Sequence, residues 1–510
     1  MDGFQARIDF VQTHFPAQGD IPMTDVSIVM QLPLWTFPLG LPKSPEKPPD
    51  LHSLWQFPEH LPECVTSSPT VMRCFELLAP LDWAHFPERN LQRHWGQSQI
   101  PYAARAAAEL IRLNENRPST KSLRCLLLEH PGFICLLGFP LALAPETPLG
   151  FNARASLPTR QHWNKMLRRM PNAALQFLLA DSVRLIRAEL RARQAPEVDC
   201  VSLDTKHILA WVQENNPKAY VADRFNKEKQ PRGDPDCRLG CKRRHNRVSP
   251  STTPTRNPRS AATLKVGEYY WGYGSGVVVA QVPDYGEFVI AEMTQPFDQG
   301  DVTYFFPLMR QTEERLGYRP PYATFDAAFD AWYVYAHFHR ENDPRGGFAA
   351  VPFSEKGGYT ATGRQFSPDG LPICAAGLAM PVQFTYTDRT TCLVAHERGK
   401  YVCPLPRSRT GRVACPIHHA NARRGGCTAM MPTSIGARLR YTLDRDSAEY
   451  KAIYRQRTAV ERINSQAVAL GIERPHLRNG QAIANQNTLI YVLINLRFLQ
   501  RLRQGLHQDE

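Results

Sequence analysis

The chain has 510 residues, of which 43% are hydrophobic and 21% are charged. This length predicts about three domains. The composition excludes a disordered chain and a small disulfide-stapled scaffold. No run approaches the roughly 18 apolar residues that a membrane span needs, and Met1 to Gln12 lacks the apolar segment of a signal peptide. We therefore expect a cytoplasmic protein whose 12 cysteines are free thiols, metal ligands or core residues.

The net charge of +13 is concentrated in two short segments. Residues 213–265 contain 13 Lys and Arg against 5 Asp and Glu, and residues 397–445 contain 10 against 2. Two basic segments on an otherwise nearly neutral body favour a polyanionic partner such as nucleic acid. Solvated basic loops are the alternative interpretation of the same pattern.

The first 200 residues predict an irregular region followed by helices. Eight prolines lie between Gln31 and Pro62, and proline fixes φ and removes a backbone donor. We therefore expect residues 1–100 to be irregular. From Tyr102 the segment YAARAAAELIRLNEN has apolar residues three and four apart, and a long helical stretch is predicted from Gln161 to Arg193. Residues 101–197 are thus predicted to form a helical domain.

From Val198 onward, short strands alternate with helices. Strands are predicted at residues 198–204, 269–282, 288–293, 322–325 and 348–353, and helices at residues 301–316, 327–340, 444–470 and 485–503. This alternation predicts an α/β domain with a mixed sheet flanked by helices. It would consist of residues 198–353 and 445–505. Residues 354–444, rich in Gly, Pro, Cys and Arg, would form an irregular insertion subdomain.

Three acidic residues occur where these elements would bring them together. Asp204 ends the first predicted strand, Asp326 ends the fourth, and Glu461 lies on the helix after the insertion. Convergent carboxylates are unfavourable unless cations compensate them, and oxygen ligands suit Mg²⁺ or Mn²⁺. Two such ions could hold the attacking and leaving oxygens of a phosphoryl displacement. An Asp at a strand end is also a common turn or cap residue, and Asp330 competes with Asp326 for the role.

Several basic and aromatic residues are candidates for contacts with nucleic acid. Tyr454 and Arg457 precede Glu461 by seven and four residues, which would place all three on one helix face. The alternative is a solvated face with ion pairs. The other candidates for contacts with a DNA backbone are Lys242, Arg243, Arg244 and Arg247 in a basic loop, and Arg423 and Arg424 in the insertion. Backbone contacts of this kind make binding strongly dependent on salt.

The insertion also contains a cluster of potential zinc ligands. The candidates are Cys403, Cys415, His418 and Cys427. Zn²⁺ takes tetrahedral thiolate and imidazole ligands, and a Gly-rich, Arg-rich segment has few residues from which to build a core. The alternative is that these side chains are unligated thiols. Cys237 and Cys241 with His245 form a further half-site without a convincing fourth ligand.

These motifs together resemble the DDE transposases of bacterial insertion sequences. The resembling segments are LDTKH around Asp204, YATFDAAFDAWY around Asp326 and YRQRTAVERINSQ around Glu461. The last is similar to a Y-x2-R-x3-E-x6-K signature, in which the lysine position is Val468 here. Arg474 and Arg478 are candidates for the missing basic residue. The likeness extends from Leu123 to the C-terminus, because residues 123–193 resemble the helical domain that precedes catalysis in such enzymes.

The resemblance implies an RNase H-like catalytic domain with two Mg²⁺ or Mn²⁺ ions held by the three acids. Such an enzyme binds the terminal inverted repeats of its element in double-stranded DNA. It cleaves the strand and transfers the 3′-hydroxyl to target DNA, usually as a homodimer on paired ends in the bacterial cytoplasm. Two alternatives stay open: an RNase H-like nuclease without strand transfer, and a non-catalytic zinc-containing DNA-binding protein.

Overall fold

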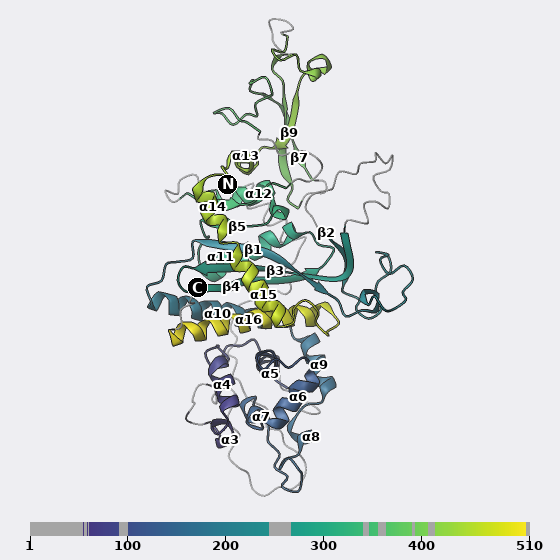
Figure 1. Ribbon diagram of the computed structural model, residues 1–510, viewed down its shortest axis with the longest axis vertical. Helices are drawn as coiled ribbons and strands as arrows, with labels where there is room; N and C mark the ends of the chain where they lie inside the picture. Colours follow the sequence, from purple (N-terminus) through teal and green to yellow (C-terminus); the bar gives the residue numbers. More distant parts are fainter. Residues whose placement is uncertain are drawn as a thin grey trace.

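The computed structural model of the protein describes Trp55, Glu59 and residues 61–90, 100–243, 267–339, 346–354, 364–389, 393–405 and 414–505. Three parts follow one another along its longest axis (Figure 1). A helical region lies at one end, a mixed sheet with flanking helices lies in the middle, and a small three-stranded sheet lies at the other end. The middle part contacts both of the others.

The helical region is built from short helices. They are α3 (Glu63–Thr66), α4 (Pro69–Leu78), α5 (Tyr102–Asn114), α6 (Thr120–Glu129), α7 (Gly132–Leu136), α8 (Ala153–Ser156) and α9 (Arg160–Arg169). α5 confirms the predicted helix from Tyr102 and is buried along nearly all of its length. Its charged residues are paired within the helix, because Arg105 and Arg112 both form ion pairs with Glu109.

Residues 61–90 are part of this region, although the sequence pattern predicted them to be irregular. α4 buries Val71, Phe75 and Leu78, whose spacings of four and three residues place them on one helix face. Pro69 occupies the first helical position, where its missing N–H is not needed. The prediction was wrong because it extended the irregular structure expected of the proline-rich segment, which ends at Pro62, across the short helical period of α4.

The predicted helical stretch from Gln161 to Arg193 is two helices. α9 ends at Arg169 and α10 (Asn172–Ala192) begins after Pro171. A proline disfavours helical geometry in the residue before it, and Met170 is extended, with ψ at 124°. The break lets α9 join the helical region while α10 packs against the sheet.

The sheet consists of β1 (Cys200–Leu209), β2 (Arg238–Arg243), β3 (Gly267–Val282), β4 (Gly286–Pro296), β5 (Tyr322–Thr324) and β6 (Phe348–Ala350). Its order is β2-β3-β1-β5-β6, and β4 also pairs with β3. β1, β3 and β4 pair antiparallel, whereas β1, β5 and β6 pair parallel. The prediction of an α/β domain with a mixed sheet is therefore confirmed. β2 lies inside the segment predicted as a basic loop.

β1 is longer than the predicted strand, which ended at Asp204. It pairs with β3 from Val201 opposite Ala280 to Leu209 opposite Gly272. Asp204 consequently lies in the middle of the strand rather than at its end. Polar residues beyond Asp204 concealed this continuation, because the pairing partner that keeps them extended lies about 70 residues away in the chain.

The longest helix, α16 (Gly480–Gln504), lies between the sheet and the helical region (Figure 1). It contacts α10 and β4 on the sheet side and α5 and α9 on the other side. The predicted helix from Asn485 to Arg503 is confirmed, but it is buried around its circumference rather than amphipathic. Neither α16 nor any other helix in the described ranges has the length and apolar character to cross a membrane.

Two further predicted helices are interrupted. The 301–316 stretch begins as a 3-10 turn (Asp301–Tyr304) before α11 (Phe305–Leu316), and the 327–340 stretch is a 3-10 turn (Ala327–Phe329) followed by α12 (Trp332–Phe338). The two 3-10 turns contact each other; Asp301 begins the first and Asp326 caps the second.

The insertion contains regular structure, contrary to the prediction. β7 (Val382–Asp388), β8 (His396–Val402) and β9 (Thr428–Pro432) form an antiparallel sheet, followed by α13 (Ile435–Thr442). Most β7 side chains are exposed on both faces, so the strand lacks the apolar alternation from which strands are predicted. The buried cluster beneath this sheet is small and consists of Met380, Tyr401, Met431 and Ala437.

Candidate active site

Asp204 and Asp326 are brought together by the parallel pairing of β1 with β5. Ser202 on β1 lies opposite Thr324 on β5, and their hydroxyl oxygens are 2.8 Å apart. Each aspartate lies two residues beyond this pair and therefore on the same face of the sheet. The register places both carboxylates side by side on that face, next to the C-terminal end of β5, as the order of elements predicted.

Glu461 approaches this face from α15 (Thr458–Ala469), which packs against β1 and β3. The predicted single helix over residues 444–470 is in fact α14 (Ala448–Arg455) and α15, separated at Gln456. The backbone carbonyl of Gln456 accepts a hydrogen bond from Ser202 Oγ at 3.2 Å, which places the break beside β1. Tyr454 therefore lies on α14 and Arg457 at the start of α15, so the prediction of one shared helix face was wrong.

Arg457 lies between two of the acids. Its Nη2 is 3.7 Å from Asp204 Oδ1, and its Nη1 donates to Glu461 Oε1 at 2.7 Å. Its side chain is only 21% exposed, whereas the Glu461 side chain is 56% exposed. The guanidinium thus supplies a positive charge to Asp204 and Glu461.

The carboxyl group of Asp204 is largely buried and lies near other charges. Burial raises its pKa to about 6, the nearby Arg457 lowers it, and the charges of Asp326 and Asp301 raise it. Its Oδ2 accepts a hydrogen bond from Asn464 Nδ2 at 3.1 Å. The elevated pKa means that one arginine does not fully compensate the desolvated carboxylate.

Tyr454 contacts the same environment from α14. Burial raises the pKa of its hydroxyl, Arg457 lowers it, and the charges of Asp326, Glu461 and Asp204 raise it further. All three acids therefore lie close enough to influence one phenol. The structure brings the three predicted acids together with Tyr454 and Arg457.

Asp330, the rival of Asp326, is engaged in a different network. Its side chain is fully buried and forms a bidentate ion pair with Arg440, whose Nε is 2.7 Å from Asp330 Oδ1. It also accepts hydrogen bonds from the Tyr335 hydroxyl and the Ser354 amide, both at 2.8 Å. Its acceptor sites are occupied by the protein, so its role is structural.

Two polar residues near the acids were missed by the sequence reasoning. Asn464 follows Glu461 by three residues on α15, and this helical spacing was the signal that could have identified it. Asp301 accepts a hydrogen bond from Thr205 Oγ1 at 2.9 Å. No signal in the local sequence marked Asp301, because its approach depends on the fold of the β4–α11 connection.

The described residues include no group of three or more His, Cys, Asp or Glu side chains placed so as to hold a metal ion. At the carboxylate cluster, Arg457 occupies space between Asp204 and Glu461, and Asp326 Oδ1 accepts a hydrogen bond from the Ala328 amide at 2.9 Å. The donor atoms are therefore near one another but not arranged as a coordination sphere.

Most of the predicted zinc ligands also approach one another. Cys403 follows β8, Cys427 precedes β9, and the Cys403 amide donates to the Cys427 carbonyl at 2.8 Å. Burial raises the pKa of the Cys427 thiol, and the nearby Cys374, Cys403 and Cys415 raise it further. Cys374 thus joins three of the four predicted residues.

The histidine beside these thiols is His419 rather than the predicted His418. His419 Nδ1 lies 3.6 Å from Cys427 Sγ. The His418 amide donates to the Cys415 carbonyl at 3.0 Å, which closes a turn. The His418 side chain is exposed. A helical or strand period cannot distinguish two adjacent histidines in a turn, and the turn geometry decides between them.

The predicted backbone-contacting residues are only partly covered by the structure. Lys242 and Arg243 lie on β2, opposite Glu268 and Gly267 of β3, and not in a loop. Arg423 and Arg424 lie in a 3-10 turn (Ala420–Arg424) of the insertion. Arg244 and Arg247 lie outside the described residues.

No protein-family model matches this sequence, and no curated protein is significantly similar to it.

Proposed function

We propose that this chain is a DNA transposase with an RNase H-like catalytic domain. It would bind the terminal inverted repeats of an insertion sequence, cleave the strand and transfer its 3′ end to target DNA. The observation that carries this proposal is the convergence of Asp204, Asp326 and Glu461 from three elements that are distant in the chain. A mixed sheet with an acid on β1, and an insertion between β6 and the helix of the third acid, also support it.

The three carboxylates fit Mg²⁺ or Mn²⁺ by donor chemistry. They offer hard oxygen ligands. Burial, together with the charges of Asp326 and Asp301, raises the pKa of Asp204, and a bound cation would favour its ionised form. Asp204, Asp326 and Glu461 are the residues that would hold two ions. When bound, such ions activate an attacking oxygen and stabilise the leaving oxygen of a phosphodiester.

The neighbouring residues then have specific tasks. Asn464 donates to Asp204 and holds the orientation of its carboxylate. Arg457 pairs with Asp204 and Glu461 in the absence of other cations. Once another cation compensates the acids, its guanidinium group can donate to phosphate oxygens instead. The Tyr454 hydroxyl faces the same space and is a further phosphate contact.

The insertion would be stabilised by one structural Zn²⁺. Cys403, Cys415 and Cys427 with Cys374 or His419 supply the thiolate and imidazole ligands that zinc prefers. Binding would have to draw these donors closer together than they lie in this structure. A metal would compensate for the small buried cluster of this part.

We propose that the helical region binds DNA ends, and that the enzyme acts as a homodimer on paired ends in the cytoplasm. The decisive experiment is a cleavage assay with labelled DNA carrying the sequences that flank this gene, in Mg²⁺ or Mn²⁺. Asp204→Asn removes one carboxylate charge without changing shape. Asp446→Asn is the matched control, because Asp446 has a fully exposed side chain outside the cluster.

Metal-dependent cleavage at the element boundary, lost in Asp204→Asn and retained in Asp446→Asn, is the expected result. Cleavage that never yields joined strands would favour the nuclease alternative. Salt-sensitive binding without any cleavage in either metal would favour the non-catalytic DNA-binding protein.

A further inference from the structure

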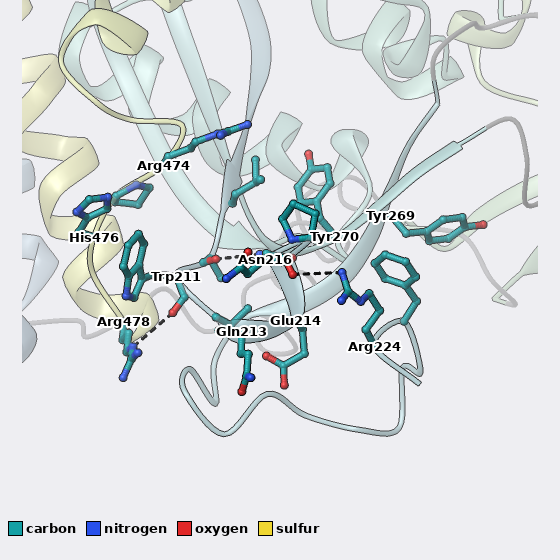
Figure 2. A pocket seen from close by; sticks show the side chains of 17 residues that line it. Trp211, Gln213, Glu214, Asn216, Arg224, Tyr269, Tyr270, Arg474, His476 and Arg478 are labelled. Carbon is teal, nitrogen blue, oxygen red and sulfur yellow. Dashed lines mark hydrogen bonds between the residues drawn. The ribbon is translucent and has the colours of Figure 1, made fainter. Parts of the chain in front are cut away.

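A large open groove lies beyond the end of β1 (Figure 2). Its volume is about 1270 Å³, compared with roughly 300–1,000 Å³ for typical small-molecule pockets. One wall is the segment from Leu209 to Pro217, and the opposite walls come from Tyr269 and Tyr270 of β3 and from the loop between α15 and α16. The groove therefore suits an extended ligand rather than a compact one.

Aromatic rings line both sides of the groove (Figure 2). Trp211 lies against His476, with ring centroids 4.0 Å apart, and Phe225 lies near Tyr269, with centroids 6.2 Å apart. Trp211 is 47% exposed and Phe225 is 49% exposed. Large aromatic side chains exposed together on a concave surface are typical of a binding site.

The charge of the groove is predominantly positive. Arg224, Arg474 and Arg478 line it, together with one acidic residue, Glu214. Arg474 is exposed and forms no hydrogen bond or ion pair with any residue that the structure describes, and Arg478 uses only its Nε, which donates to the Trp211 carbonyl at 3.3 Å. Guanidinium groups are thus presented to a ligand rather than neutralised.

The groove is structurally connected to the carboxylate cluster. The α15–α16 loop is fixed to β1, because the Leu209 amide donates to the Glu473 carbonyl at 2.8 Å and Lys206 forms an ion pair with Glu473 at 2.5 Å. Leu209 lies five residues beyond Asp204 on the same strand. At about 3.3 Å per residue, this is about 17 Å, a distance that a few nucleotides of a DNA strand can span.

We propose that this groove binds unpaired nucleotides of a DNA strand that continues from the carboxylate cluster. Bases would stack on Trp211 and on the Phe225–Tyr269 pair, while Arg474 and Arg478 contact the phosphates. Aromatic rings interleaved with basic side chains are the features by which proteins hold single-stranded nucleic acid. The inference rests on the proposed function for its choice of DNA as the ligand.

The test measures binding without metal, so that it does not depend on cleavage. A fluorescent single strand of about 12 nucleotides, within the range of known single-strand sites, and a blunt duplex of the same length are titrated in EDTA. Trp211→Ala is expected to weaken single-strand binding about ten-fold, as the loss of one stacking contact does. Trp211→Phe should restore most of the affinity, and duplex binding should be unchanged in both variants.

A matched control and a second variant distinguish a loss of binding from a loss of folding. Leu143→Ala removes a 77% exposed apolar side chain that lies outside the groove and should leave both affinities unchanged. The double variant Arg474→Gln, Arg478→Gln changes two exposed side chains, and should lower the salt dependence of single-strand binding by about 1.4 in slope, at roughly 0.7 per phosphate contact.

Equal single-strand affinity of the wild type and Trp211→Ala would overturn the inference, as would an equal loss for the duplex. An unchanged salt slope in the arginine variant would overturn the phosphate contacts. If the wild type shows the expected binding pattern but never cleaves DNA, the proposed function fails and the groove assignment stands. If the protein cleaves DNA at element ends but lacks this binding pattern, the groove assignment fails and the proposed function stands.

Discussion

The carboxylate cluster and the cysteine cluster of the insertion both bring donor side chains together, but they differ in how much buried core lies beneath them. β1, β5 and α15 place the acids beside two large buried clusters, in which Leu203, Ala323 and Val460 are completely buried. The cysteines lie at the ends of β8 and β9 and in turns, above four buried residues.

This difference indicates what each cluster needs. The acids are positioned by register and packing whether or not a cation is present, so their repulsion is a cost that the core can sustain. The thiols are positioned by loops with little packing beneath them. We therefore expect metal to matter for chemistry at the first cluster and for folding at the second.

The comparison is tested most strongly by removing one charge from the acid cluster. Glu461→Gln keeps the size of a half-exposed side chain and leaves the core intact. Cleavage should fall on the order of 1,000-fold, as the loss of an electrostatic contact at an active site does, while DNA affinity and thermal stability stay the same. Unchanged cleavage in a single-turnover assay would remove Glu461 from the site.

The junction between the two regions depends on Asp330. Asp330→Ala leaves Arg440 without its buried partner, and breaking a buried pair costs about 3–5 kcal/mol. We expect this loss in the free energy of unfolding measured by urea titration, together with faster proteolysis between α12 and α13. Asp446→Ala changes an exposed aspartate and serves as the control; equal stability of the two variants would contradict the structural role.

The core beneath the acid cluster contains a buried acid, Glu292, whose pKa burial raises to about 7, while hydrogen bonds from Thr488 and Gln176 and the charge of Arg315 lower it. Between pH 4.5 and 7 the folded state retains a proton that the unfolded state releases, so stability falls as pH rises through this window. Glu292→Gln should remove this fall.

At pH 8 the Glu292→Gln variant should be more stable than the wild type by up to about 3 kcal/mol, at about 1.4 kcal/mol per pKa unit. At pH 4.5 this contribution should vanish. Urea unfolding monitored at pH 5 and pH 8 gives the comparison. The same pH slope in both proteins would show that Glu292 is already ionised in the folded state.

The smallest expected effect on the whole chain comes from removing zinc. Metal analysis of the purified protein should find about one zinc per chain, bound by the tetrahedral donor set of a structural site. A chelator should expose the β8–β9 connection to protease without lowering the main thermal transition. Purified protein free of zinc, with an insertion that resists protease, would end the zinc proposal.

Much of the site could be predicted because its members carry local signals. Asp204 lies on a recognisable strand, Asp326 follows one, and Glu461 lies on a helical segment. The helix break at Gln456 could not be predicted, because residues 444–470 have a continuous helical period. It depends on Ser202, about 250 residues away, which bonds the Gln456 carbonyl.

The exposure of Trp211 in the groove could not be predicted from the sequence either. A tryptophan after a strand is usually a core residue, and nothing in the local sequence distinguishes Trp211 from the fully buried Trp271. Its exposure is decided by the loop between α15 and α16, which packs along β1 and leaves the ring at a concave surface. The sequence marks Arg474 and Arg478 as candidate basic residues, but only this packing places them in the groove.

The sequence alone determined the features that short-range chemistry controls. The alanine-rich helix α5 and the β3–β4 hairpin are examples. In the hairpin, Asp284 and Gly286 supply the positive φ values that the turn requires. Tertiary structure alone decided the length of β1, the burial of α16, the position of Arg457 between two acids and the exposure of Trp211. Each of these depends on pairing or packing with residues far along the chain, and no local preference encodes such a partner.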